Sequence, residues 1–153
     1  MVELGKIQQS PAIVDTPAVR LHALLARADS LTLHTPHHRA ELFARHAVTQ
    51  AGGLRLTLPA AAGLARHLVD VGEVPARVEF AELGTGRTGD RVRARAALLG
   101  WLTPDALHGD DLVAHLDLAS ADLVDPDGAE EVDPDEFRAA AGCPPDPSGR
   151  YCT

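Results

Sequence analysis

Aromatic residues are scarce in this sequence. They make up 3% of the 153 residues, with one Trp, one Tyr and three Phe. Little aromatic surface is therefore available to stack on a base or a flavin ring, and the core must be built from Leu, Val and Ala. Basic residues are outnumbered by acidic ones, which gives a formal net charge of -8. This balance argues against nucleic acid or an anionic membrane as a partner, because either would require a basic surface.

Long apolar runs and cysteines are also few. No stretch reaches the length that spans a bilayer, and the N-terminal residues lack the charged-then-apolar pattern of a signal peptide. Cys143 and Cys152 are the only cysteines; a reduced pair is the default for them, and a disulfide within the tail is the alternative. We therefore expect a cytoplasmic protein with one domain over residues 15–142, a flexible arm over 1–14, and a Pro/Gly-rich tail over 143–153.

Three short helices are predicted from capping residues and apolar spacing. Thr16 followed by Pro17 is typical of a helix start, and an apolar stripe extends that helix to about Ala28. Pro59 is expected to open a second helix. The capping-box sequence at 133–136 predicts a third helix near the C-terminal end.

Alternation of apolar and polar residues predicts most of the strands. A turn follows the last of them at Asp125-Pro126-Asp127-Gly128. Many short strands with few helices indicate a small barrel. The alternating segments are residues 31–34, 54–58, 74–80, 91–98 and 112–118.

Residues 36–49 fit two patterns. The segment alternates as a strand would, but it also fits a helical stripe made of Ala40, Phe43, Ala44, Ala47 and Val48. The segment runs into a glycine turn at 51–53 and then into a clean alternating strand, which is a hairpin signal. We therefore predict a strand, with His46 on the same face as Leu42, Ala44 and Val48.

The order of these elements resembles the FMN-binding split-barrel superfamily of pyridoxamine 5'-phosphate oxidase-like proteins. Within it, the chain is most similar to the haem-utilisation branch, in particular its actinobacterial versions. The resemblance covers about residues 30–140. It is carried by AELFARHAV (40–48), GLRLTLP (53–59), RVRAR (91–95) leading to GWL (100–102), and VDPDEFRAA (132–140).

This resemblance implies a mainly β, α+β fold in the form of a six-stranded antiparallel split barrel. It also implies a homodimer with the cofactor at the subunit interface. In oxidase-like members a serine and basic residues after the equivalent of strand 53–58 bind the flavin phosphate, but here Ala62, Gly63 and Leu64 stand there. Without charge-assisted contacts a phosphate binds weakly, so we expect FMN to bind weakly or not at all. Many haem-utilisation relatives continue into a helical domain after the barrel, and we expect this chain to lack it.

Histidines are the richest source of candidate ligands, because an imidazole can ligate haem iron or another transition metal. His46 is the first candidate for haem iron, since its predicted face is apolar. His37 and His38 are the next candidates for the iron. The alternative for His46 is a core histidine held by one hydrogen bond, and the alternative for His37 and His38 is a solvated loop.

Arginines supply the candidate anion contacts. Arg91, Arg93 and Arg95 alternate along one predicted strand, facing Arg77 and Glu79 on the preceding strand. They predict either a solvated face with cross-strand ion pairs or a clamp for a phosphate, a haem propionate or an acidic partner. A further candidate for cofactor binding is Arg55 on strand 54–58.

Residues 84–89 match the dinucleotide fingerprint G-x-G-x-x-G literally. The segment leads into an alternating strand and not into a helix that could face a pyrophosphate, so we interpret it as a hairpin loop.

Three functions remain open from the sequence. The favoured one is a dimeric split barrel that binds haem or another tetrapyrrole, with a degenerate flavin-phosphate site. The second is a cofactor-free barrel that acts through a protein partner. The third is an FMN-dependent oxidoreductase, and if the chain is an enzyme at all the resemblance implies redox chemistry carried by the cofactor.

Overall fold

The computed structural model describes residues 16–49, 52–83, 92–126 and 128–142, with the backbone alone at 83, 92–93 and 141–142. Its helices are α2 (Pro17–Arg27), α3 (Gly63–Val71) and α4 (Pro134–Gly142). Its strands are β1 (Ser30–Thr35), β2 (His38–Phe43), β3 (His46–Val48), β4 (Leu54–Pro59), β5 (Val74–Leu83), β6 (Val92–His108), β7 (Asp111–Asp125) and β8 (Gly128–Val132).

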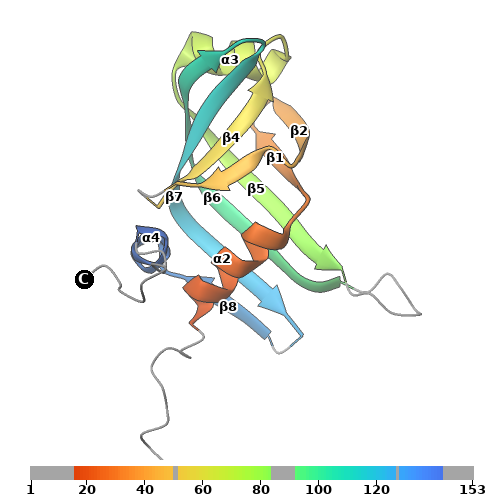
Figure 1. Ribbon diagram of the computed structural model, residues 1–153, viewed down its shortest axis with the longest axis vertical. Helices are drawn as coiled ribbons and strands as arrows, with labels where there is room; N and C mark the ends of the chain where they lie inside the picture. Colours follow the sequence, from red (N-terminus) through yellow and green to blue (C-terminus); the bar gives the residue numbers. More distant parts are fainter. Residues whose placement is uncertain (1–15, 50–51, 84–91, 127, 143–153) are drawn as a thin grey trace, which may run out of the picture.

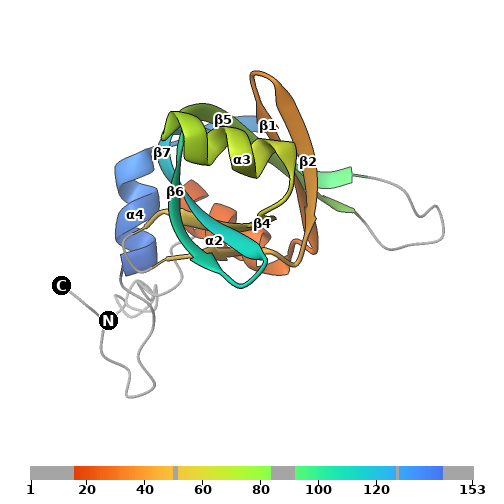
Figure 2. The same cartoon turned by 90° about the horizontal axis from the view of Figure 1, so that it is seen from above.

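These strands form one antiparallel sheet that curls into a barrel-like shape (Figures 1 and 2). The strand order is β2-β1-β5-β6-β7-β4-β3, and β8 pairs with β7. In the part of the chain that the structure describes, the edge strands β2 and β3 are not paired with each other, so the sheet is not closed. The fold is thus α+β and mainly β, as the sequence predicted.

The predicted number of six strands is wrong, because the sheet has eight. The segment predicted as one strand up to Val48 is divided into β2 and β3 at Ala44, whose φ of 55° lies in the left-handed region. Ala44 is exposed while Leu42 is buried, so the predicted continuous face does not exist. The eighth strand, β8, follows the predicted turn at Gly128 and was not anticipated, because Glu130 and Glu131 conceal its alternation.

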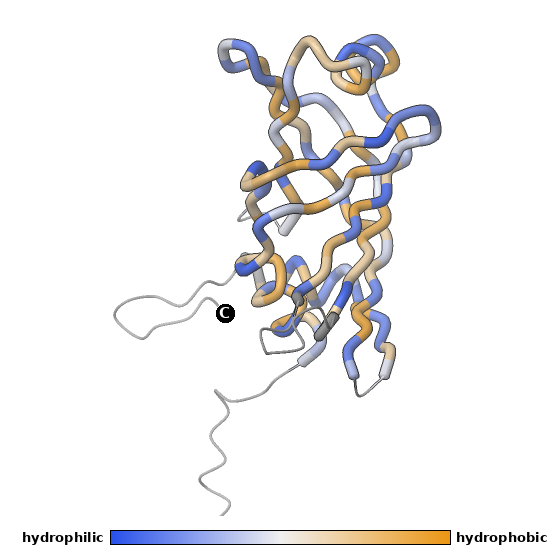
Figure 3. The backbone as a smooth tube through the Cα atoms, turned by 90° about the vertical axis from the view of Figure 1, so that its right-hand side faces the viewer, coloured by the Kyte–Doolittle hydropathy of each residue, from blue (hydrophilic) through white to orange (hydrophobic). Residues whose placement is uncertain are grey.

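A core of leucine, valine and alanine fills the inner side of the sheet. Leu33, Leu56, Leu98 and Leu116 are all 0% exposed, and none of the buried residues in the described segments is polar or charged. The tube in Figure 3 shows the corresponding alternation of hydrophobic and hydrophilic residues along the strands. The core is therefore mainly aliphatic, as the scarcity of aromatics predicted, but it also contains Phe80 and Phe137.

The helices close the two ends of the barrel-like sheet, with α3 at the top of Figure 1 and α2 and α4 near the bottom. Thr16 caps α2 as predicted, its hydroxyl accepting a hydrogen bond from the Val19 amide at 3.2 Å. The Asp133 carboxylate accepts one from the Asp135 amide at 2.9 Å at the start of α4. The second helix begins at Gly63 and not at Pro59, because β4 continues through Pro59 and a turn follows it. Each helix in the described segments is too short to traverse a lipid bilayer.

Gly100 allows the long strands β6 and β7 to approach closely where they bend. A Cβ atom on Gly100 would lie 2.1 Å from the Asp117 carbonyl oxygen, and the register of the two strands shifts at this point. A side chain is therefore excluded here by the neighbouring backbone, and the irregularity sharpens the local bend.

Candidate functional site

Six neighbouring strands of the sheet present a second face, which points away from the core. We call it the outward face; its strands, in order across the sheet, are β2, β1, β5, β6, β7 and β8. Because residues directly opposite in an antiparallel pair project to the same side, the registers place its side chains in rows. One row is mainly acidic. The next row has basic residues on β2, β1 and β5 and uncharged residues on β6 and β7. The acidic row contains Glu41, Thr32, Glu79, Ala97, Asp122 and Glu131, and the next row contains Arg39, His34, Arg77, Leu99 and Ser120.

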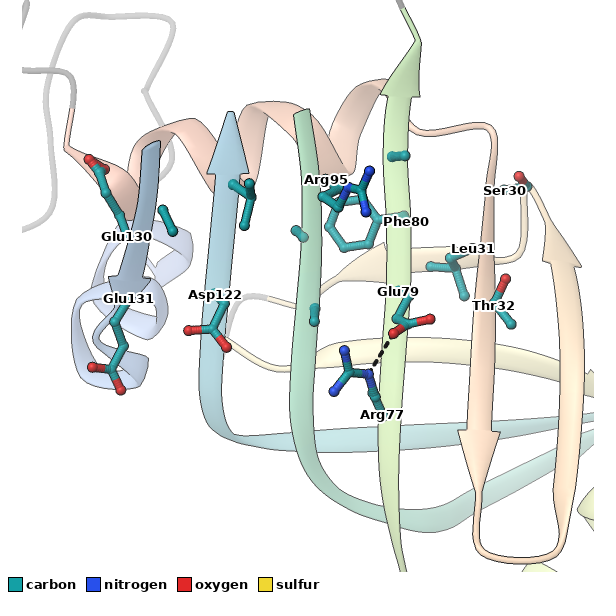
Figure 4. Close-up of a pocket in the computed structure, with 15 residues that line it drawn as sticks. Ser30, Leu31, Thr32, Arg77, Glu79, Phe80, Arg95, Asp122, Glu130 and Glu131 are labelled. Carbon is teal, nitrogen blue, oxygen red and sulfur yellow. Dashed lines mark hydrogen bonds and ion pairs between the residues drawn. The ribbon is translucent and has the colours of Figure 1, made fainter. Parts of the chain in front are cut away.

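A groove of about 880 Å³ lies on this outward face. Four alanines line it, and three of them, Ala81, Ala97 and Ala129, lie on the outward face with charged side chains around them. Figure 4 shows the groove-lining side chains on β1, β5, β6, β7 and β8, with α2 behind the sheet. The small side chains leave room for a ligand or a partner surface between the charges.

Glu79 lies between two basic side chains, Arg77 and His34, at this groove. The Arg77 guanidinium donates to its carboxylate at 2.6 Å, and the His34 imidazole lies 3.2 Å from its other oxygen. The hydrogen bond from Arg77 is the main reason that the pKa of Glu79 is lowered. Burial opposes this, and the interactions with the charge of Arg77 and with His34 lower the pKa further. Glu79 is therefore a fixed anion whose partners already lie in the same chain.

Arg95, Asp122 and Glu131 differ from this cluster because they make no ion pair within the described residues. All three are exposed. Asp122 and Glu131 lie directly opposite each other on β7 and β8, an unfavourable arrangement for like charges. Figure 4 shows Arg95 directed toward the β5 side of β6, away from Asp122.

His46, the first predicted iron ligand, lies on β3 opposite the fully buried Leu56. Its Nε2 lies 3.0 Å from the Leu25 carbonyl of α2, and its Nδ1 is buried without a hydrogen-bond partner in the described structure. His46 thus points to the inner side of the sheet, whereas Arg95 lies on the outward face. The structure does not bring these two predicted site residues together.

His37 and His38 lie near α3, at the end of the molecule far from the groove. The ring of His67 from α3 is 6.1 Å from the ring of His37 and 5.5 Å from that of His38. No group of three or more metal-ligating side chains in the described segments is arranged to hold a metal ion. The three histidine rings thus lie close together in the fold. His37 and His38 are adjacent in sequence, but the sequence does not reveal that His67 lies beside them.

The predicted arginine row is placed only in part. Arg91 lies outside the described residues, as does the side chain of Arg93. Arg55 is exposed on β4, opposite His115 of β7, and does not line the groove. Arg95 is thus the one predicted cofactor contact that the structure places at the groove.

Sequence reasoning missed the acidic pair Asp122 and Glu131. A signal for it was present, because a tight turn at Asp125–Gly128 fixes which residues of the two flanking strands lie opposite each other. The link between His34 and Glu79 had no local signal, since it depends on the pairing of β1 with β5 across 45 residues.

Comparisons with known proteins bear on the fold. No protein-family model matches the chain, and no curated protein sequence does. A solved structure described as a haem-binding protein from Mycobacterium smegmatis matches with a TM-score of 0.66 at 13% identity, over 86% of this chain and 64% of that one. The chain thus spans less than two thirds of that protein's length.

Two further solved structures are similar. One has a TM-score of 0.60 at 17% identity and covers 78% of this chain and 93% of its own. Another, a protein of unknown function from Agrobacterium tumefaciens, has a TM-score of 0.51 at 13% identity over 81% of this chain and 66% of its own. At such identities the likeness concerns architecture alone. The chain shares a barrel-like, mainly antiparallel fold with these proteins.

Proposed function

We propose that this chain is a split-barrel subunit that forms a homodimer through its outward face and binds haem or a related tetrapyrrole in the groove there. The groove is the main observation that supports this proposal. Its volume of about 880 Å³ lies in the range of small-molecule sites, and its alanines leave space for a flat ring. The shared fold of the mycobacterial haem-binding protein supports the same choice.

The groove suits some parts of a haem better than others. Arg95 has no ion pair within the described residues, so its guanidinium is available to a propionate. No histidine is among the described residues that line the groove, although His34 adjoins it through Glu79. The groove of one subunit therefore offers space for the ring of a tetrapyrrole and one guanidinium, that of Arg95, for a propionate. Four acidic side chains also line it, and no described lining residue offers an imidazole to the iron. We propose binding, and no redox step.

His46 remains a separate candidate for iron. Ligation would require its Nε2 to leave the Leu25 carbonyl, or its buried Nδ1 to become accessible. Since His46 and the groove lie on opposite sides of the sheet, one haem could not use both. FMN remains the disfavoured ligand, because Ala62 at the start of α3 provides no side-chain hydrogen bond to an anion.

A cofactor-free module that binds a protein is the second candidate function. The outward face exposes Leu99, Trp101 and Val124, which are 37%, 47% and 40% exposed. Large apolar side chains gathered on one face are typical of interaction surfaces. This observation supports a partner surface whether or not a cofactor binds.

Titration with hemin, metal-free protoporphyrin IX and FMN tests the choice. We expect hemin and protoporphyrin to bind with similar affinity, because the groove contacts the ring and the carboxylates, and FMN to bind far more weakly. Arg95→Ala should weaken both tetrapyrroles about tenfold or more, the effect of losing one charge-assisted hydrogen bond. Arg66→Ala, on the exposed side of α3, is the matched control.

Three other results of these titrations would each overturn part of the proposal. Absence of binding by both tetrapyrroles would refute the cofactor and favour the protein-binding module. Loss of the Soret shift in His46→Ala, with Arg95→Ala unaffected, would move the site to the inner side of the sheet. Stoichiometric FMN that survives gel filtration would overturn the expectation of a degenerate phosphate site.

A further inference from the structure

We propose that unpaired charges on the outward face fix how two copies of this chain pair: Arg95 of one copy contacts Asp122 and Glu131 of the other. This inference rests on the homodimer of the proposed function and specifies its interface. It concerns the association of chains without a bound tetrapyrrole, because a propionate and the acidic pair of the partner would compete for Arg95.

The contrast between paired and unpaired charges on this one face is the first argument. Arg39 and Glu41 are 3.0 Å apart, and Arg77 and Glu79 are 2.6 Å apart, so the β2–β5 side of the face satisfies its own charges. On the β6–β8 side, Arg95, Asp122 and Glu131 make no such contact within the described chain. The unsatisfied set contains both signs, which a second copy of the same surface can complement.

The acidic pair provides the second argument. Asp122 and Glu131 lie directly opposite each other, and like charges in this position destabilise a sheet. Their neighbour Glu130 is neutralised by Arg20 of α2 on the other side of the sheet. A cation approaching the outward face would remove the repulsion between Asp122 and Glu131, and Arg95 is the cation that each copy has to offer.

The contact between Arg95 and the acidic pair is compatible with a two-fold symmetric dimer. In a two-fold dimer every contact is made twice, so Arg95 reaching the acidic pair of its partner implies the reverse contact as well. Leu99, Trp101 and Val124 lie on the same face and are 37–47% exposed. Their burial would drive association, while the charges determine register and partner choice.

Charge-reversed variants test the pairing. One chain carries Arg95→Glu, and another carries Asp122→Arg with Glu131→Arg. We expect each variant alone to raise the dissociation constant of the homodimer roughly tenfold or more, by placing like charges together. Mixing the two should restore tight association as a heterodimer, measured by sedimentation and by native mass spectrometry of chains with different masses.

The mixing step separates the proposal from a contact within one chain. An ion pair between Arg95 and Asp122 of the same copy would be lost in both variants, but it could not produce a preference for heterodimers. Glu136→Lys, an exposed residue of α4, controls for the change in net charge. Circular dichroism checks folding, and the neutral variants Arg95→Gln and Asp122→Asn serve if a reversal unfolds the chain.

These measurements distinguish failure of the homodimer from failure of the charge pairing. A wild-type chain that stays at 16.1 kDa at all concentrations would overturn the homodimer and this inference together. A wild-type dimer whose affinity none of these variants changes, or a mixture without preference for heterodimers, would overturn the charge pairing and leave the homodimer standing.

Discussion

The two faces of the same strands follow different rules. On the inner face of β6, Leu98 is 0% exposed, whereas the next residue, Leu99, points outward and is 37% exposed. The inner face holds no buried polar residue in the described segments, while the outward face carries rows of charges and an alanine-lined groove. The difference indicates that the inner face determines the fold and that specific recognition belongs to the outward face.

Gly100→Ala should have the largest effect, because Gly100 lets β6 and β7 approach and thereby shapes both faces. The new Cβ would lie 2.1 Å from the Asp117 carbonyl oxygen, and neither backbone can yield easily. We expect a loss of about 4 kcal/mol or more in the free energy of unfolding, measured by urea denaturation.

Gly109→Ala is the matched control, since Gly109 has a φ of 61° but no atom within 4 Å of the added methyl group. It should lose only about 1–2 kcal/mol, the cost of the left-handed conformation. Equal losses in the two variants would show that the close approach at Gly100 is not required.

Leu98→Ala and Leu99→Ala test the two faces with the same chemical change. Leu98→Ala should cost about 2–4 kcal/mol, because it removes a fully buried side chain and leaves a cavity. Leu99→Ala should change monomer stability by less than about 1 kcal/mol and should instead weaken self-association. Denaturation and light scattering measure the two effects, and a large loss of monomer stability in Leu99→Ala would contradict the division between faces.

Local patterns predicted much of the fold. Alternation of apolar residues identified the strands around Leu33, Leu56 and Leu98, and the Thr16 cap located the start of α2. The left-handed conformation of Ala44 had no sequence signal, since alanine rarely adopts it. That one residue divides a predicted strand into β2 and β3.

The candidate site was less predictable than the fold, for a physical reason. Which outward side chains meet depends on register between strands far apart in sequence, as for His34 on β1 and Glu79 on β5. Spacing along the chain identified Arg95 as a candidate. Alternation also assigned His46 to the apolar side with Leu42 and Val48, but it could not show that the Leu25 carbonyl of α2 lies 3.0 Å from its Nε2.

Trp101 offers a spectroscopic view of the outward face, since it is the only tryptophan of the chain and is 47% exposed. Its emission should shift to shorter wavelength as concentration rises through the dissociation constant of the dimer, because the indole loses contact with water. The variants with reversed charges should show the shift only when mixed. A concentration-independent spectrum in a chain that does dimerise would place Trp101 outside the interface.

The smallest expected effect concerns pH and the inner side of the fold, where His22 of α2 stacks on Phe137 of α4 with ring centroids 4.0 Å apart. Its Nε2 donates a hydrogen bond to the Phe137 carbonyl oxygen at 2.8 Å. Burial lowers the pKa of His22 below its ordinary value of 6.5, although the backbone hydrogen bond partly opposes this.

The sign of the pH effect follows from that lowered pKa. As pH falls through about 6.5, the unfolded chain takes up a proton at His22 before the folded chain does, so stability decreases on acidification and is fully present above that pH. Denaturation at pH 7.5 and 5.5 should therefore show a smaller loss in His22→Gln than in the wild type, whereas His108→Gln, at the exposed tip of β6, should lose as much as the wild type. If His22→Gln lost as much stability on acidification as the His108 control, the contact between α2 and α4 would not be the titrating element.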